Sequence, residues 1–267
     1  MTLDILRYDG RKRIESAIGL SAAFALMALA FVAFAPLITT DLAASAGFEQ
    51  VLNDLPQPFI EAFGLESLAS LEGLLAGEFY TLFWAVFFGL YLAYTAAGSI
   101  RGDIDADRMD VLLANPVSRT TVLVEKFLSL LVPIVVANVV TPAVIYGGTL
   151  FIDASIAVEE LVMVHALSIP YLLCCGAVGL FLSVLLDSRD TAQNAAIGLL
   201  FSLYLLESFI VATDVGWVAN VAPMHYFDAN EILVAGSYDF ASAGVLLVAT
   251  LVLVAVSQVR FARMDIQ

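Results

Sequence analysis

A few polar residues interrupt long apolar stretches, and their side chains are the ones most able to carry chemistry. Glu207 is the acidic residue that lies well inside such a stretch, and an ionisable group within a bilayer is costly enough to suggest a function. On a helix, Gln193, Tyr204 and Glu207 fall within about 60° of each other and form one polar face. Tyr204 and Glu207 could line a pathway for a solute, or Glu207 could be protonated or hydrogen-bonded at a helix interface.

A second set of polar residues lies in the third and fourth apolar stretches. Asn138 and Thr141 share a helix face between two prolines, where they could bind a solute or satisfy the carbonyls that the prolines leave free. The adjacent cysteines Cys174 and Cys175 have neither disulfide nor zinc spacing, and a soft-metal role lacks nearby Met or Cys partners. The sequence therefore predicts no metal site and leaves the role of these thiols open.

Sequence motifs of common catalytic sites are missing. No GxxxxGK[ST] phosphate-binding loop occurs, so the chain cannot bind and hydrolyse ATP unaided. It also lacks HExxH and GxSxG motifs, and its histidines are His165 and His225. We therefore expect no catalytic residue and no cofactor bound by this chain, which makes an intramembrane enzyme the least favoured alternative.

Composition indicates a membrane protein. Hydrophobic residues make up 61% of the 267 residues and charged residues 14%, against roughly 25% charged in soluble domains. A chain of this length has too small an interior to bury so much apolar surface, so lipid must solvate much of it. The net charge of −15 excludes nucleic acid as a partner. The composition of the chain, with few lysines and many acidic residues, resembles that of proteins from salt-loving archaea.

Six apolar stretches are each long enough to cross a bilayer as a helix. Their apolar runs are continuous, whereas transmembrane strands alternate. We therefore predict an all-α polytopic membrane protein that forms one transmembrane domain over residues 1–267. The six stretches lie at about 16–38, 80–100, 124–150, 161–186, 192–213 and 241–259.

Lysine and arginine residues indicate the orientation in the membrane. All eleven lie before the first stretch, in alternate connections or at the ends of the stretches beside them, or after the last stretch, and the other three connections contain none. The positive-inside rule then places both termini in the cytoplasm. We expect a cytoplasmic interfacial helix at 1–15, an outer loop with amphipathic helices at 39–79, a cytoplasmic loop at 101–122 and an outer loop at 214–240.

The cytoplasmic loop after the second stretch contains a short apolar segment. Val111, Leu112 and Leu113 predict a helix that must stop before Pro116, because proline disfavours helical backbone at the residue before it. Ser118 can cap the helix that follows. A short apolar helix at this face must lie on the lipid surface or in the groove of a partner.

This loop resembles the signature loop of type 2 ATP-binding cassette exporter permeases, notably their archaeal branch. The lead-in Asp107-Arg108 departs from the Gly-Thr pair usual in that family. The resemblance extends to six spans, a long first outer loop and the segment 223–228 before the last span. Its specific part is the run Asp110-Val111-Leu112-Leu113-Ala114-Asn115-Pro116-Val117-Ser118-Arg119.

The resemblance implies a multi-pass permease subunit of the plasma membrane that exports a substrate. Energy would come from a separate ATPase subunit, which would hold ATP and Mg²⁺. The loop would dock on that ATPase, and Arg119 would pair with an acidic residue of the ATPase or with a lipid phosphate. The coupling residues would be Asp110, Val111, Leu112, Leu113, Pro116, Ser118 and Arg119.

In that family two permease chains, identical or different, enclose the pathway and meet through their first and fifth spans. Candidate pathway residues are then Asn138, Tyr204 and Glu207. The alternative is a secondary transporter driven by an ion gradient, with Glu207 as the coupling site. Such transporters often contain inverted repeats, and none is evident in this sequence.

The predicted orientation can be tested by labelling of intact cells. Cysteines introduced as Ile60→Cys and Asn230→Cys should react with an impermeant thiol reagent, because both positions lie in outer loops. Asp107→Cys should react only after the cells are opened. The unsubstituted chain gives the background from Cys174 and Cys175, and labelling of position 107 in intact cells would overturn the orientation.

Overall fold

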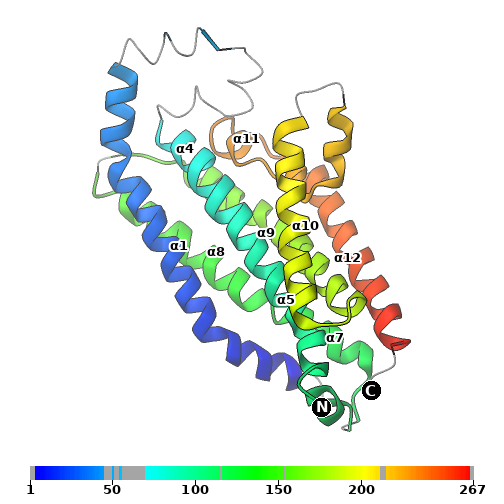
Figure 1. Cartoon of the computed structure of the whole chain (residues 1–267). Helices are drawn as coiled ribbons and strands as arrows, with labels where there is room; N and C mark the ends of the chain where they lie inside the picture. The colour runs from blue at the N-terminus through cyan, green and yellow to red at the C-terminus, as the bar shows by residue number, and fades with distance from the viewer. Residues whose placement is uncertain are drawn as a thin grey trace.

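The computed structural model describes residues 4–44, 50, 54–55, 70–114, 116–152, 154–210 and 215–264. The described part is helical and contains no β-strand. Six of its helical segments are long and apolar enough to cross a membrane. These findings confirm the predicted all-α polytopic membrane protein. Both described ends of the chain lie at the same end of the helix bundle (Figure 1), and the orientation of that end in the membrane stays a prediction.

The first span is one long helix, α1 (Asp4–Ala44). The segment at 1–15, expected as a separate interfacial helix, is continuous with the span from Asp4 onward, and the ribbon curves without a break (Figure 1). Most of the outer loop at 39–79, with its expected amphipathic helices, lies outside the described residues.

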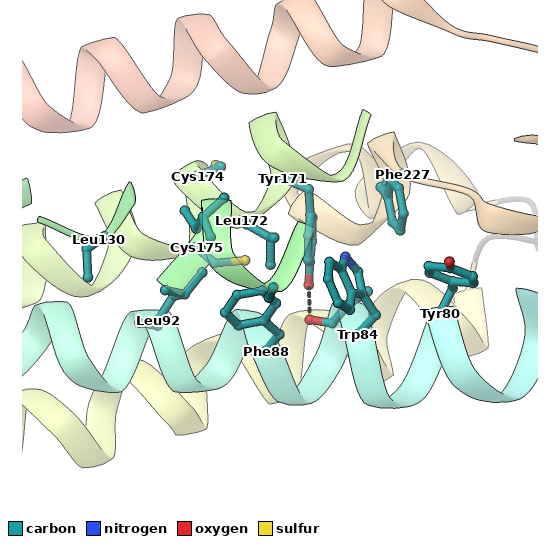
Figure 2. Packing of buried hydrophobic residues seen from close by; sticks show 14 of the residues in the cluster. Tyr80, Trp84, Phe88, Leu92, Leu130, Tyr171, Leu172, Cys174, Cys175 and Phe227 are labelled. Carbon is teal, nitrogen blue, oxygen red and sulfur yellow. Dashed lines mark hydrogen bonds between the residues drawn. The ribbon is translucent and has the colours of Figure 1, made fainter. Parts of the chain in front are cut away.

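The second span begins at Leu71 rather than near residue 80. It consists of α4 (Leu71–Leu74), η2 (Leu75–Phe88) and α5 (Gly89–Ile104) in one rod. The segment η2 is a π-helix, in which each N–H bonds the carbonyl five residues back. Figure 2 shows buried aromatic side chains of η2 that point toward a neighbouring helix. A dashed line marks the 3.1 Å hydrogen bond that Tyr171 Oη donates to the Ala85 carbonyl.

The third span is α7 (Arg119–Leu128) followed by α8 (Leu131–Thr149), and α8 packs along α1. The fourth, α9 (Val158–Leu185), is the most buried and packs on α5. A Cβ built on Gly179 would lie 2.1 Å from the carbonyl oxygen of Ala93, so only glycine permits this close approach of the two helices.

The fifth and sixth spans, α10 (Arg189–Ile210) and α12 (Phe240–Ala262), are the least buried. The segment between them forms η3 (Gly216–Val221), η4 (Pro223–Tyr226) and α11 (Ala229–Leu233). Phe227 folds back into the bundle, where it is buried and stacks on Tyr171 with ring centroids 5.7 Å apart. This segment therefore closes part of the end of the bundle that lies away from the described termini (Figure 1).

A buried hydrogen-bond network joins the second, third and fourth spans. Tyr80 Oη lies 2.9 Å from His165 Nε2, and His165 Nδ1 lies 3.2 Å from Asn138 Oδ1. An amide oxygen can only accept, so the imidazole donates from Nδ1 and accepts the tyrosine hydroxyl at Nε2. Trp84 Nε1 donates to Ser168 Oγ at 3.0 Å. These bonds fix how the three helices are rotated against each other.

The two histidines provide a matched test of this network. The variant His165→Leu leaves the buried Tyr80 hydroxyl without its partner, and an unsatisfied buried group costs about 1–3 kcal/mol. The free energy of unfolding in detergent should fall by that amount. His225→Leu replaces a half-buried residue of η4 outside the network and should change stability by less than about 0.5 kcal/mol. Equal losses in the two variants would show that the network does not stabilise the fold.

Candidate functional site

The loop between the second and third spans contains the short helix α6 (Arg108–Leu113). Asp107, with φ 53°, provides the left-handed turn between α5 and α6. The chain leaves the helix before Pro116, as predicted, and Ser118 Oγ accepts a bond from Thr121 N at 3.0 Å, which caps α7. Local sequence signals therefore account for both ends of the loop.

The apolar side chains of α6 have unequal environments. Met109 is fully buried and anchors the helix. Leu112 and Leu113 are half-buried against the hydrophobic core. Val111 is 68% exposed and is the apolar side chain of the helix that is best placed to contact another protein. Asp110 and Pro116 are also exposed.

A groove of about 520 Å³ separates α6 from the first turns of α1. Apolar side chains from both helices form much of its surface, with Val111 and Leu112 on one side. Charged side chains from four helices complete it. The lining residues are Ile5, Tyr8, Asp9, Lys12, Asp103, Arg108, Val111, Leu112, Val117 and Lys126.

A buried lysine connects the helices around this groove. Lys126 of α7 is 5% exposed, and its Nζ lies 2.5 Å from Asp103 Oδ2 and 3.2 Å from Asp9 Oδ2. Arg108 Nη2 lies 2.7 Å from the other oxygen of Asp103. A buried charge is tolerated when it is paired and hydrogen-bonded. The cluster therefore ties α1, α5 and α6 to α7.

The sequence did not identify Asp9, Asp103 and Lys126 as one site. A second link supports the same contact, because the Leu6 N–H of α1 donates to Glu125 Oε2 of α7 at 2.9 Å. The available signal was the pair of charged residues, Glu125 and Lys126, at the start of an apolar stretch. Charges in that position are expected to have partners, but spacing alone does not show which ones.

Arg119 contacts the end of the sixth span. Its Nη1 donates to the carbonyls of Phe261 at 3.2 Å and Met264 at 2.5 Å. The guanidinium also lies 5.8 Å from the centre of the Phe261 ring. A cation that binds the last carbonyls of a helix is stabilising. Arg119 therefore caps α12, a role that the sequence did not predict.

The candidate pathway residues lie in two separate regions. Asn138 belongs to the buried network, and its Nδ2 donates to the Ile134 carbonyl at 2.8 Å. That carbonyl is not one that a proline leaves free. Its neighbour Thr141 is buried, and its hydroxyl has no partner within the described residues. Tyr204 and Glu207 lie half-buried near the C-terminal end of α10. Within the described residues, no hydrogen bond joins the two regions.

Among the described residues, no group of three or more His, Cys, Asp or Glu side chains is placed to hold a metal ion. Cys174 and Cys175 are buried free thiols in α9. The buried charged side chains Glu125 and Lys126 of the described part lie in α7, at the end of the bundle that carries α6. The groove beside α6 is the place where charge, exposed apolar surface and open space coincide.

Comparison with known proteins identifies the family of this chain. A family model described as "ABC-2 family transporter protein" matches residues 4–266. No curated protein matches the chain significantly. The matched range includes all six spans and α6. The chain belongs to the ABC-2 transporter family and is a multi-pass membrane permease subunit of an ATP-binding cassette transporter.

Proposed function

We propose that this permease exports its substrate with energy from a separate ATPase subunit that docks on α6 and the first turns of α1. The observation that carries the proposal is the groove beside α6, in which exposed apolar residues lie next to a fixed set of charges. The chain has no phosphate-binding loop, so ATP and Mg²⁺ belong to the partner. Export, as opposed to import, follows from the resemblance of the loop to exporter permeases.

The ion cluster explains how docking could move the spans. A push on α6 reaches Asp103 through Arg108, and Asp103 is bound to Lys126 of α7. Separating a buried ion pair costs about 3–5 kcal/mol. The cytoplasmic ends of α1, α5 and α7 would therefore move as one body, and closure of the ATPase would be transmitted to three spans together.

A second permease chain is proposed to pack on α10. Asn194, Gly198 and Ser202 are exposed at intervals of four residues along this helix. A Cβ built on Gly198 has no neighbour within 4 Å. Small and polar residues on one face permit close packing and hydrogen bonds between transmembrane helices. The partner would be an identical chain or a related permease, and the pathway would lie between the two.

The docking surface can be tested with Val111→Asp. The change places a charge in an apolar contact and should cost about 2–4 kcal/mol if the contact is desolvated, which is roughly a 30- to 1000-fold loss of affinity. The variant should reach the membrane normally, fail to retain the ATPase on purification and fail to transport. Leu112→Asp should have the same effect but also destabilise the fold, because Leu112 packs against the core.

Val158→Asp is the matched control for docking, because Val158 is 54% exposed at the start of α9, far from α6. It should retain the ATPase. Normal ATPase retention by the Val111→Asp protein would contradict the proposed docking surface.

The dimer surface can be tested with Gly198→Leu. A leucine there would hold two helices apart and should weaken permease self-association at least about tenfold, or about 1.4 kcal/mol. Mass photometry of the purified protein in nanodiscs would measure the fraction of dimers. Gly244→Leu on α12 is the control, because a Cβ on Gly244 also meets open space. Unchanged dimerisation in the Gly198 variant would exclude this face of α10.

A further inference from the structure

The sixth span carries an exposed groove that has no role in the proposed transport cycle. The groove has a volume of about 440 Å³ and lies near the end of α12 that is next to α7. Its walls are three small apolar side chains, and two arginines lie at one end. The lining residues are Ala255, Val256, Val259, Arg260 and Arg263, and all five are exposed.

An exposed apolar stripe continues from this groove along α12. Val248, Val252, Val256 and Val259 follow helical spacing, and each is about half exposed or more. α12 is among the least buried spans of the described part. In a membrane this stripe must contact hydrocarbon chains or another protein. The groove gives a hydrocarbon chain a place to lie lengthwise along the helix.

The two arginines at the end of the stripe lack the partners that other cations of this region have. Arg101, Arg108 and Lys126 each pair with an aspartate. Within the described residues, no ion pair or hydrogen bond is formed by the guanidinium of Arg260 or of Arg263. Neither is needed to cap α12, because Arg119 already binds the final carbonyls.

We propose that this groove binds an anionic phospholipid of the cytoplasmic leaflet. The acyl chain would lie along Val252, Val256 and Val259, and the phosphate between Arg260 and Arg263. Residues three apart on a helix share a face, and guanidinium groups bind phosphate through paired hydrogen bonds. The distribution of basic residues along the sequence places this end of α12 at the cytoplasmic leaflet. Two cations at the end of an apolar stripe match a charged headgroup with an attached chain.

Native mass spectrometry of the purified full-length protein tests the proposal, with phosphatidylglycerol and phosphatidylcholine as probes. The Arg260→Gln/Arg263→Gln protein should bind phosphatidylglycerol about 25-fold more weakly, because each arginine near an anionic headgroup contributes about fivefold. Its binding of phosphatidylcholine should weaken less, because the choline cation of that lipid offsets the charge of its phosphate. Val256→Asn should also weaken phosphatidylglycerol binding, although it removes no charge.

Arg7→Gln/Arg11→Gln is the matched control, because it removes two exposed cations from α1 at the same end of the bundle. It should bind phosphatidylglycerol as the unsubstituted protein does. Equal losses in the two double variants would show diffuse attraction and overturn the site. Full binding by the Arg260→Gln/Arg263→Gln protein would also overturn it. Competition by inorganic phosphate at the lipid concentration would show an anion site without the acyl-chain groove, and would refute the lipid assignment.

Discussion

Lipid offers no hydrogen-bond partner, so a polar group that this chain takes into the membrane is costly unless another part of the chain satisfies it. The network of Tyr80, His165 and Asn138 meets this requirement across three spans. It also selects one rotation of each helix, because a rotated helix would leave its donors and acceptors in hydrocarbon. The close contact of Gly179 with Ala93 then brings the fourth span against the second. Polar pairing and close backbone packing together define the centre of the bundle.

At the end of the bundle where the loops with basic residues lie, helix α7 joins the spans, as the buried network does at the centre. Glu125 and Lys126 bind the first turns of α1, and Lys126 also forms an ion pair with the end of α5. Arg119 donates a hydrogen bond to the end of α12. One amphipathic helix of ten residues thus contacts three spans through three charged side chains. The short helix α6 precedes α7 in the chain, so a partner that binds α6 acts next to the helix that joins these three spans.

The sequence predicts the features that depend on local patterns, and these agree with the structure. Continuous apolar runs indicated the six spans, and Pro116 and Ser118 indicated the ends of the loop helices. The start of the second span was predicted too late, because Leu71 and Leu75 with Glu72 between them resemble the pattern of an amphipathic surface helix. The bond between Lys126 and Asp9 joins residues 117 apart, and that between Arg119 and Phe261 joins residues 142 apart. Such pairs depend on how the helices pack, which no local spacing reports.

The bond between Arg119 and the end of α12 also has a consequence for biosynthesis. The ribosome makes Arg119 well before Phe261 and Met264, so the arginine has no carbonyl partners until the sixth span has been inserted. Until then its charge is solvated by water and lipid headgroups. The cytoplasmic-loop end of the bundle is therefore completed last during translation. A newly made chain acquires its finished surface for other subunits only after every span has entered the membrane.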